Sequence, residues 1–184
     1  MKPLFLAALL ALAPLAHADD AVWAKLKAGG NVLLIRHAST ESGLGDPPGF
    51  KLGDCTTQRN LSEAGRVEAR RLGRQFQFRA INLAPIRSSQ WCRCLETARL
   101  AFNQEPEPWP LLNSLNAQPD KEFDLTDEVN ALAAKVKPPY NAVLVTHNFN
   151  SRALTGISPK EAEIIVARSV GGKLEVVGRL ALPQ

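Results

Sequence analysis

The sequence predicts an α/β fold, a three-layer sandwich with a mostly parallel central sheet, helices on both faces and a C-terminal β-hairpin. Two segments, residues 31–36 and 141–146, each contain a continuous apolar run, Val32 to Ile35 and Ala142 to Val145, as is typical of strands that are buried on both faces. Segments of helical periodicity alternate with these strands, which is typical of layered α/β proteins. Near the C-terminus, two short apolar segments flank Gly171-Gly172, the pattern of a hairpin.

Capping residues, apolar spacing and chain breakers predict the elements in between. Ser62 can cap a helix, and Pro138 and Pro139 end another. The expected elements are a strand at 31–36, a loop at 40–60, a helix at 62–77, a strand at 81–86, a helix from Ser88 or Ser89 to about Phe102, a short strand around Leu111 and Leu112, a helix at 121–137, a strand at 141–146, and a hairpin of 163–168 with 173–180. A loop as long as 40–60 in a compact domain is usually functional.

Residues 1–18 have the pattern of a secretory signal peptide, and residues 19–184 are expected to form one domain. A basic Lys2 is followed by an apolar run, and small residues precede a predicted cut after Ala18. The run is too short to span a bilayer comfortably, which disfavours the alternative of a membrane anchor. We therefore predict an exported protein, periplasmic or secreted, without stable membrane insertion after cleavage.

The charge of the chain favours small anionic ligands. The formal net charge is +4, with no block of Lys and Arg and little aromatic interleaving, so no nucleic-acid partner is expected.

Three cysteines, Cys55, Cys92 and Cys94, remain after the predicted cut. An exported chain meets an oxidising compartment, so one disulfide is expected. Cys92 and Cys94 lie two residues apart in an expected helix and point to different faces, so Cys55 pairs with either Cys92 or Cys94. This spacing is not that of a zinc site, and neither a metal nor a cofactor is expected.

Basic groups follow three of the expected strands. Arg36 and His37 follow the first buried strand, His147 follows the second, and Ser89 and Arg93 open a helix after a third. Ligands of open α/β sheets bind beyond the carboxyl ends of the strands, and helix N-termini attract anions. A single histidine at a strand end is more often structural, but two of them accompanied by arginines favour a phosphoryl site, where arginine binds oxygens and histidine serves as nucleophile.

Four segments, "LLIRHAST", "RNLSEAGR", "SSQWCRCLETA" and "VLVTHNFNSRALTG", span residues 33–156 in this order. On these segments the chain resembles the histidine phosphatase superfamily, the phosphoglycerate-mutase-like group. It is most similar to small exported members, including those that act on lipopolysaccharide heptose phosphate. The resemblance implies a phosphatase that forms a phosphohistidine intermediate, with a phosphorylated small molecule or a glycan phosphate as substrate.

The resemblance also assigns roles to residues. His37 matches the phosphorylated histidine, Arg36 and Arg93 match the arginines that bind the phosphoryl group, and His147 matches the second histidine of the pocket. Ser89 matches the serine of the segment that carries Arg93.

Three further residues are candidates for substrate binding. Thr40 and Asn150 lie near the motifs, with a structural role as the alternative for each. Arg59, beside the long loop, is the stronger candidate, and a solvated surface arginine is its alternative.

The chain departs from the family pattern at the general acid. Many relatives carry a Glu after the second helix, where this chain has Asn113 and Ser114. Asn148 follows His147, which excludes the branch that uses a His-Asp pair. The remaining carboxylates considered, each with a structural alternative, are Asp46, Asp54 and Asp120.

Three other functions compete with a phosphatase. A protein that only binds a phosphorylated ligand would share the pocket, a mutase would move phosphate within a sugar acid, and a thiol–disulfide protein would use Cys92 and Cys94. Export disfavours the mutase, and the absence of a C-x-x-C motif disfavours the thiol–disulfide protein. The sequence predicts no oligomeric state.

Overall fold

The computed structural model of the protein describes residues 15–181, with side chains from residue 19 onwards. The elements are α1 (Leu15–Ala28), β1 (Val32–Arg36), η1 (Cys55–Thr57), α2 (Glu63–Phe78), β2 (Leu83–Ser88), α3 (Cys92–Phe102), β3 (Glu107–Pro108), η2 (Pro110–Leu112), η3 (Pro119–Lys121), α4 (Glu122–Lys135), β4 (Asn141–Thr146), α5 (Asn148–Thr155), β5 (Ile164–Val170) and β6 (Lys173–Leu180). The predicted signal peptide lies largely outside the described residues and stays a prediction. Across 15–181, no helix combines the length and apolar character needed to cross a bilayer.

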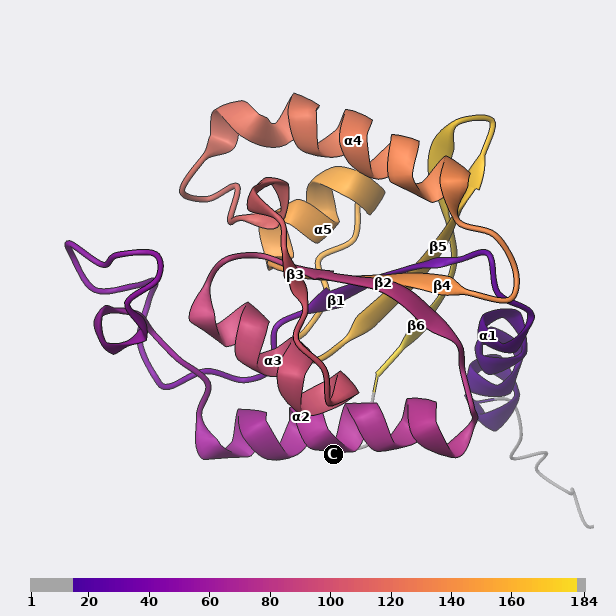
Figure 1. Cartoon of the computed structure of the whole chain (residues 1–184), viewed down its shortest axis with the longest axis horizontal. Coiled ribbons are helices and arrows are strands. Elements are labelled where there is room, and N and C mark those ends of the chain that lie inside the picture. The colour runs from indigo at the N-terminus through magenta and orange to yellow at the C-terminus, as the bar shows by residue number, and fades with distance from the viewer. Residues whose placement is uncertain (1–14, 182–184) are drawn as a thin grey trace, which may run out of the picture.

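A single six-stranded sheet runs through the molecule in the order β3-β2-β4-β1-β5-β6 (Figure 1). Strands β1 to β4 pair in parallel, whereas β5 pairs antiparallel with β1 and with β6. The last two strands form the C-terminal hairpin, so the predicted fold class is confirmed.

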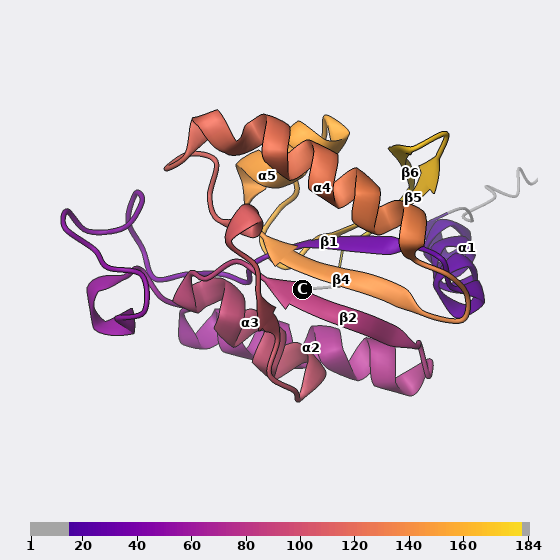
Figure 2. The same cartoon turned by 45° about the horizontal axis from the view of Figure 1, so that its top comes forward.

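Helices α2 and α3 cover one face of the sheet, and α4 and α5 cover the other (Figures 1 and 2). Along β1, Leu33 and Ile35 pack with α2 and α3, whereas Val32 and Leu34 pack under α4. Because both faces of the central strands are buried, the inner positions of β1 and β4, residues 32–35 and 142–145, are all apolar, which explains the continuous apolar runs of the sequence.

Helix α2 matches its prediction closely because its signals are local. The Ser62 hydroxyl caps it by accepting a hydrogen bond from the Gly65 backbone N–H, and Ala69, Leu72 and Phe76, which are spaced to lie on one face of the helix, are buried.

Helix α3 begins later than predicted. Strand β2 continues to Ser88 in register with β4, and the N-cap of the helix is Trp91, so neither Ser88 nor Ser89 caps it. The predicted start was therefore wrong, because the pairing of β2 keeps these two serines out of the helix.

Other segments also differ from expectation. The predicted strand around Leu111 is the 3-10 turn η2, because Pro110 occupies its first position and has no N–H to donate to a neighbouring strand. Helix α5, which follows His147 directly, was not predicted, because its eight residues are too few for a clear helical period.

Helix α2 lies so close to α3 that a Cβ at Gly73 would overlap the carbonyl oxygen of Ala101. Alanine is normally favoured over glycine in a helix by about 1 kcal/mol, but here the backbones must separate. We expect Gly73→Ala to lower the free energy of unfolding by about 1–3 kcal/mol in urea denaturation. Arg74→Ala, at the neighbouring exposed position, should change it by less than about 0.5 kcal/mol. A stabilised Gly73→Ala variant would contradict this close packing.

Candidate functional site

The carboxyl ends of β1, β4 and β2 bring three distant segments to one edge of the sheet. The His37 N–H donates to the Thr146 carbonyl at 3.0 Å, and the Ser89 N–H donates to the Val145 carbonyl at 2.9 Å. These bonds extend the strand ladders by one residue, so His37, His147 and Ser89 lie side by side where the strands end.

His37 has a defined tautomer. Its Nδ1 lies 2.9 Å from the Ala38 carbonyl oxygen, which can only accept, so Nδ1 carries the hydrogen of a neutral ring. Nε2 then keeps its lone pair. The His37 and His147 rings meet edge to face with centroids 5.5 Å apart, and both side chains are buried.

Both imidazoles are held in the neutral form. Burial, together with the charges of Arg93, Arg36 and Arg59, lowers the pKa of His37 to about 3, although the hydrogen bond to the Ala38 carbonyl opposes the shift. Burial also holds the pKa of His147 well below its ordinary value, with contributions from His37 and the arginines. A neutral imidazole with a free Nε2 is the nucleophilic form of histidine.

Ser89 orients His147. Its Oγ lies 2.8 Å from Nε2 of His147 and 3.3 Å from Oδ1 of Asn113, which also accepts a hydrogen bond from the Gln90 N–H. The Cys94 thiol lies 3.6 Å from the same ring nitrogen, and burial raises its pKa to about 12. Ser89 therefore supports the second histidine, while Cys94 remains a protonated and unreactive thiol.

Two arginines of the site are held by carboxylates. Arg36 donates to the Pro159 carbonyl at 3.1 Å and pairs with Glu161 at 3.4 Å. Arg93 is only 5 % exposed and pairs with Asp46 at 2.7 Å.

Three arginine Nε atoms, those of Arg36, Arg59 and Arg93, are buried without a hydrogen-bond partner. Buried donors are normally satisfied, so three unpaired N–H groups in one cationic region indicate a missing acceptor with several oxygens. A phosphoryl group meets this requirement, because its negative charge is spread over three equatorial oxygens that arginine can bind.

The predicted substrate-binding residues differ in their placement. Arg59 lies near enough for its charge to act on His37, and its Nη1 donates to the Gly43 carbonyl at 2.6 Å. Thr40 lies at the root of the long loop, where its backbone pairs with Leu61.

Asn150 holds the backbone of the segment that carries Asn113. It is fully buried, accepts a hydrogen bond from the Leu115 N–H, and donates to the carbonyls of Leu112 and Asn113. These bonds fix the segment that carries Asn113, which is the structural alternative considered for this residue.

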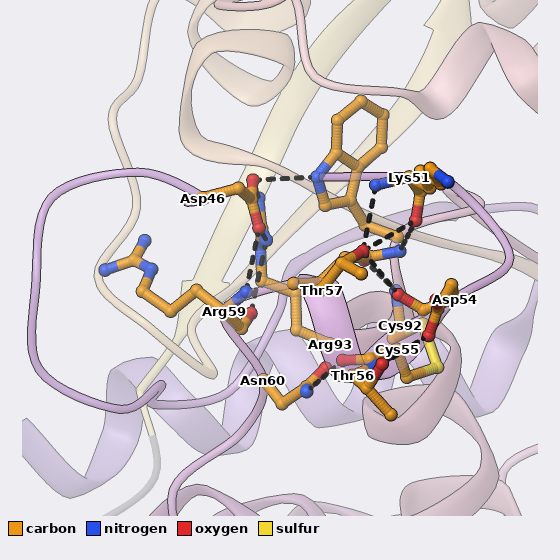
Figure 3. The surroundings of a disulfide bond; sticks show 12 residues. Asp46, Lys51, Asp54, Cys55, Thr56, Thr57, Arg59, Asn60, Cys92 and Arg93 are labelled. Carbon is orange, nitrogen blue, oxygen red and sulfur yellow. Dashed lines mark hydrogen bonds and ion pairs between the residues drawn. A yellow bond between two sulfur atoms is a disulfide. The ribbon is translucent and has the colours of Figure 1, made fainter. Parts of the chain in front are cut away.

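The disulfide joins Cys55 to Cys92, one of the two pairings left open by the sequence, and Cys94 is free. It fastens the long loop to the first turn of α3 (Figure 3). Between residues 15 and 181, no group of three or more His, Cys, Asp or Glu side chains is arranged to hold a metal ion.

The sequence did not predict the two carboxylates that pair with the site arginines. Asp46 was considered as a proton donor or a structural residue without a named partner, and Glu161 was not considered. Their partners depend on the paths of two irregular segments, for which neither spacing nor periodicity gives a signal.

A nucleophilic imidazole at the end of parallel strands, next to a second imidazole and several arginines, defines a class of phosphoryl-binding proteins with a reactive histidine. The sequence model of the histidine phosphatase superfamily (branch 1) matches residues 32–122 of the chain. The family predicted from the four motifs is thereby confirmed. Among curated protein sequences, none matches this chain.

Solved structures share the fold at low sequence identity. The protein histidine phosphatase SixA, complexed with tungstate, aligns with a TM-score of 0.60 and 15% identity over 82% of this chain and 96% of its own. A mycobacterial glucosyl-3-phosphoglycerate phosphatase, complexed with VO3, gives 0.59 and 16% over 79% and 96%. The phosphoserine phosphatase of Entamoeba histolytica, in complex with 3-phosphoglyceric acid, gives 0.58 and 15% over 83% and 97%.

The buried neutral histidines make stability depend on pH. Unfolded histidines titrate near pH 6.5, so below this pH the unfolded chain binds more protons than the folded chain. The free energy of unfolding therefore decreases as the pH is lowered. For His37, with a folded pKa of about 3, the loss at pH 5 relative to pH 7 is about 2 kcal/mol. We expect the stability of His37→Asn to fall less than that of the wild type in urea denaturation at pH 7, 6 and 5. Parallel losses in both proteins would contradict a buried neutral His37.

Proposed function

We propose that the protein is an exported phosphatase that hydrolyses a phosphorylated substrate through a phosphohistidine intermediate on His37, without a metal ion. The observation that carries the proposal is the tautomer of His37. Its Nδ1–H is donated to the Ala38 carbonyl, so the lone pair of Nε2 is free in a pocket whose arginines have unpaired donors.

In the first step, Nε2 of His37 attacks phosphorus, a P–N bond forms, and the P–O bond to the leaving group breaks. Arg36 and Arg93 bind the phosphoryl oxygens, and Ser89 fixes the ring of His147 beside them. In the second step, water attacks phosphorus, the P–N bond breaks, and phosphate leaves. Because side chains supply the positive charge, the mechanism needs no cation from solution.

The proposal of export is supported by the N-terminal pattern of residues 1–18 and by the Cys55–Cys92 disulfide, since disulfides persist mainly in oxidising compartments. A glycan phosphate, such as the heptose phosphate of lipopolysaccharide, is the finer substrate proposal, and it is supported only by the resemblance of the motifs.

None of the three carboxylates that the sequence offered as donors of the leaving-group proton is placed to act as one. Burial raises the pKa of Asp46, but hydrogen bonds from Arg93 and Trp91 and the charge of Arg93 lower it below the ordinary value, so Asp46 is ionised. Asp54 caps η1 and Asp120 lies in the exposed turn η3, and neither has a contact with the site. Asn113, where relatives carry a Glu, cannot give up a proton.

The first test is the loss of turnover in His37→Ala. We expect the wild type to hydrolyse p-nitrophenyl phosphate in the presence of EDTA and His37→Ala to lose at least about 10³-fold in kcat, because the covalent route is removed. Rapid quenching should trap acid-labile, base-stable phosphate on the wild type alone. Binding of phosphate without turnover would favour the alternative of a phospho-ligand-binding protein, and equal turnover by both proteins would exclude a histidine nucleophile.

The second test is the dependence of rate on the leaving group. General acid catalysis is worth about 10²–10⁴-fold, and its absence slows substrates whose leaving group must be protonated. We expect kcat/KM for aryl and acyl phosphates to exceed that for alkyl phosphates by about 10²-fold or more. In Asn113→Glu, kcat/KM for the alkyl phosphates should rise, so that its difference from kcat/KM for the aryl and acyl phosphates becomes smaller. Equal rates across the series for the wild type would reveal a proton donor.

A further inference from the structure

The long loop between β1 and α2 docks on the residues that open α3, the helix that carries Arg93 (Figure 3). The contacts join Phe50 to Trp91 by ring packing at 5.5 Å, Cys55 to Cys92 by the disulfide, Gln58 to the Cys92 N–H by a hydrogen bond of 3.0 Å, and Asp46 to Arg93 by the ion pair. The loop is mostly exposed elsewhere, so its position is defined mainly by these contacts.

Asp46 accepts hydrogen bonds on both carboxylate oxygens. Oδ1 accepts from Nη1 of Arg93 at 2.7 Å and from the Arg59 N–H at 3.0 Å. Oδ2 accepts from Nε1 of Trp91 at 2.9 Å and from Nη2 of Arg93 at 3.2 Å. The side chain is only 8 % exposed. Four donors therefore fix one buried carboxylate against the end of the Arg93 guanidinium.

This pairing leaves one edge of Arg93 available. Asp46 takes one hydrogen from each terminal nitrogen, and the Arg59 carbonyl accepts another from Nη1 at 3.3 Å. The Nε–H, which shares an edge of the planar fork with Nη2, is buried and has no partner. The free edge has two parallel donors, as bidentate binding of a phosphoryl group requires.

We propose that Asp46 is a positioning residue that holds the terminal nitrogens of Arg93 so that the Nε edge faces the phosphoryl group, and that the Cys55–Cys92 disulfide keeps Asp46 in place. The proposal rests on the proposed phosphatase function, because it takes a phosphoryl group as the ligand of Arg93. A buried ion pair adds little net stability over apolar residues, so the orientation that it imposes is the more important effect.

An internal inhibitor is the competing role, in which the Asp46 carboxylate occupies the place of the phosphoryl group. A carboxylate between the two imidazoles would raise their pKa values. The charges that act on His37 are instead those of Arg93, Arg36 and Arg59, and those that act on His147 are those of His37, Arg93 and Arg36. The hydrogen-bond donors to Asp46 are Arg93, Trp91 and the Arg59 N–H, and neither histidine is among them, which disfavours the inhibitor.

The disulfide links the segment that carries Asp46 covalently to the residue before Arg93. From Asp46 the chain runs to Cys55, crosses to Cys92, and reaches Arg93 at the next residue. Opening the disulfide gives the loop more conformations in which Asp46 is away from Arg93. Reduction should therefore weaken phosphoryl binding through the same contact that Asp46→Asn removes.

The test is vanadate inhibition, with kcat and KM for p-nitrophenyl phosphate measured in parallel. We expect Asp46→Asn to raise the inhibition constant of vanadate and KM by about tenfold or more, the effect of disturbing a charge-assisted hydrogen bond, with a smaller effect on kcat. Asp54→Asn is the matched control, because Asp54 is an exposed residue of the same loop, where it caps η1, and the substitution removes the same charge. This variant should change the inhibition constant and KM by less than about twofold.

Each other outcome has a defined meaning. Tighter vanadate binding by Asp46→Asn would establish the internal inhibitor, and an unchanged constant would make Asp46 a spectator, so either overturns the proposal. If the wild type does not bind vanadate, or if His37→Ala keeps full turnover, the phosphatase function fails and the role of Asp46 fails with it.

Reduction tests the role of the disulfide and does not depend on the folding of any variant. We expect a phosphine reductant to weaken vanadate binding by the wild type severalfold and to leave Asp46→Asn nearly unchanged, because the contact is already lost. The Cys55→Ser/Cys92→Ser double variant should resemble the reduced wild type. Equal weakening of the wild type and Asp46→Asn, or no effect of reduction on the wild type, would exclude the disulfide from positioning Asp46.

Discussion

The burial of several basic groups side by side at the carboxyl edge of the sheet is the constraint on which this site depends. The burial of Arg36 lowers its pKa, and the charges of Arg59 and Arg93 lower it further, opposed by Glu161. The chain accommodates these cations by keeping both histidines neutral and by pairing arginines with carboxylates. Glu161 comes from the segment before β5, and Asp46 comes from the long loop. Carboxylates from segments outside the parallel core therefore balance part of the positive charge at this edge of the sheet when no substrate is bound.

What the sequence could predict was set by local physics. Strands β1 and β4 are apolar because both of their faces are buried, and α2 has its own cap in Ser62, so these elements and the strand-end histidines were evident in advance. The start of α3 depends on the register of β2 with β4, which no local pattern contains. The choice of Cys92 over Cys94 follows from that start, because Cys92 lies beside the loop while Cys94 is buried against His147. The ion pair of Asp46 depends on the path of a loop without periodicity, so sequence alone could name the residue but not its partner.

Asn113 occupies the position where many relatives carry a Glu, and it lies beside Ser89, the residue that contacts His147. Asn113 keeps the hydrogen-bonding function of a polar side chain beside Ser89 but contributes no titratable proton. The site therefore has several side chains that can bind a phosphoryl group, but no evident side chain that can protonate the leaving group. Such an imbalance makes the choice of substrate a matter of leaving-group chemistry as much as of shape.

Helix α1 extends across the predicted processing site, and this has a consequence for the order of events during maturation. If the leader is removed after Ala18, residues 19–21 alone separate the new terminus from Val22, whose side chain is buried in the core together with Leu26. A peptidase needs its substrate extended, so cleavage must come before this helix docks. The exposed Asp19 and Asp20 would then begin the shortened helix, where acidic side chains favour its first turn. If the predicted leader is removed there, mutations that hasten docking of α1 would compete with its removal.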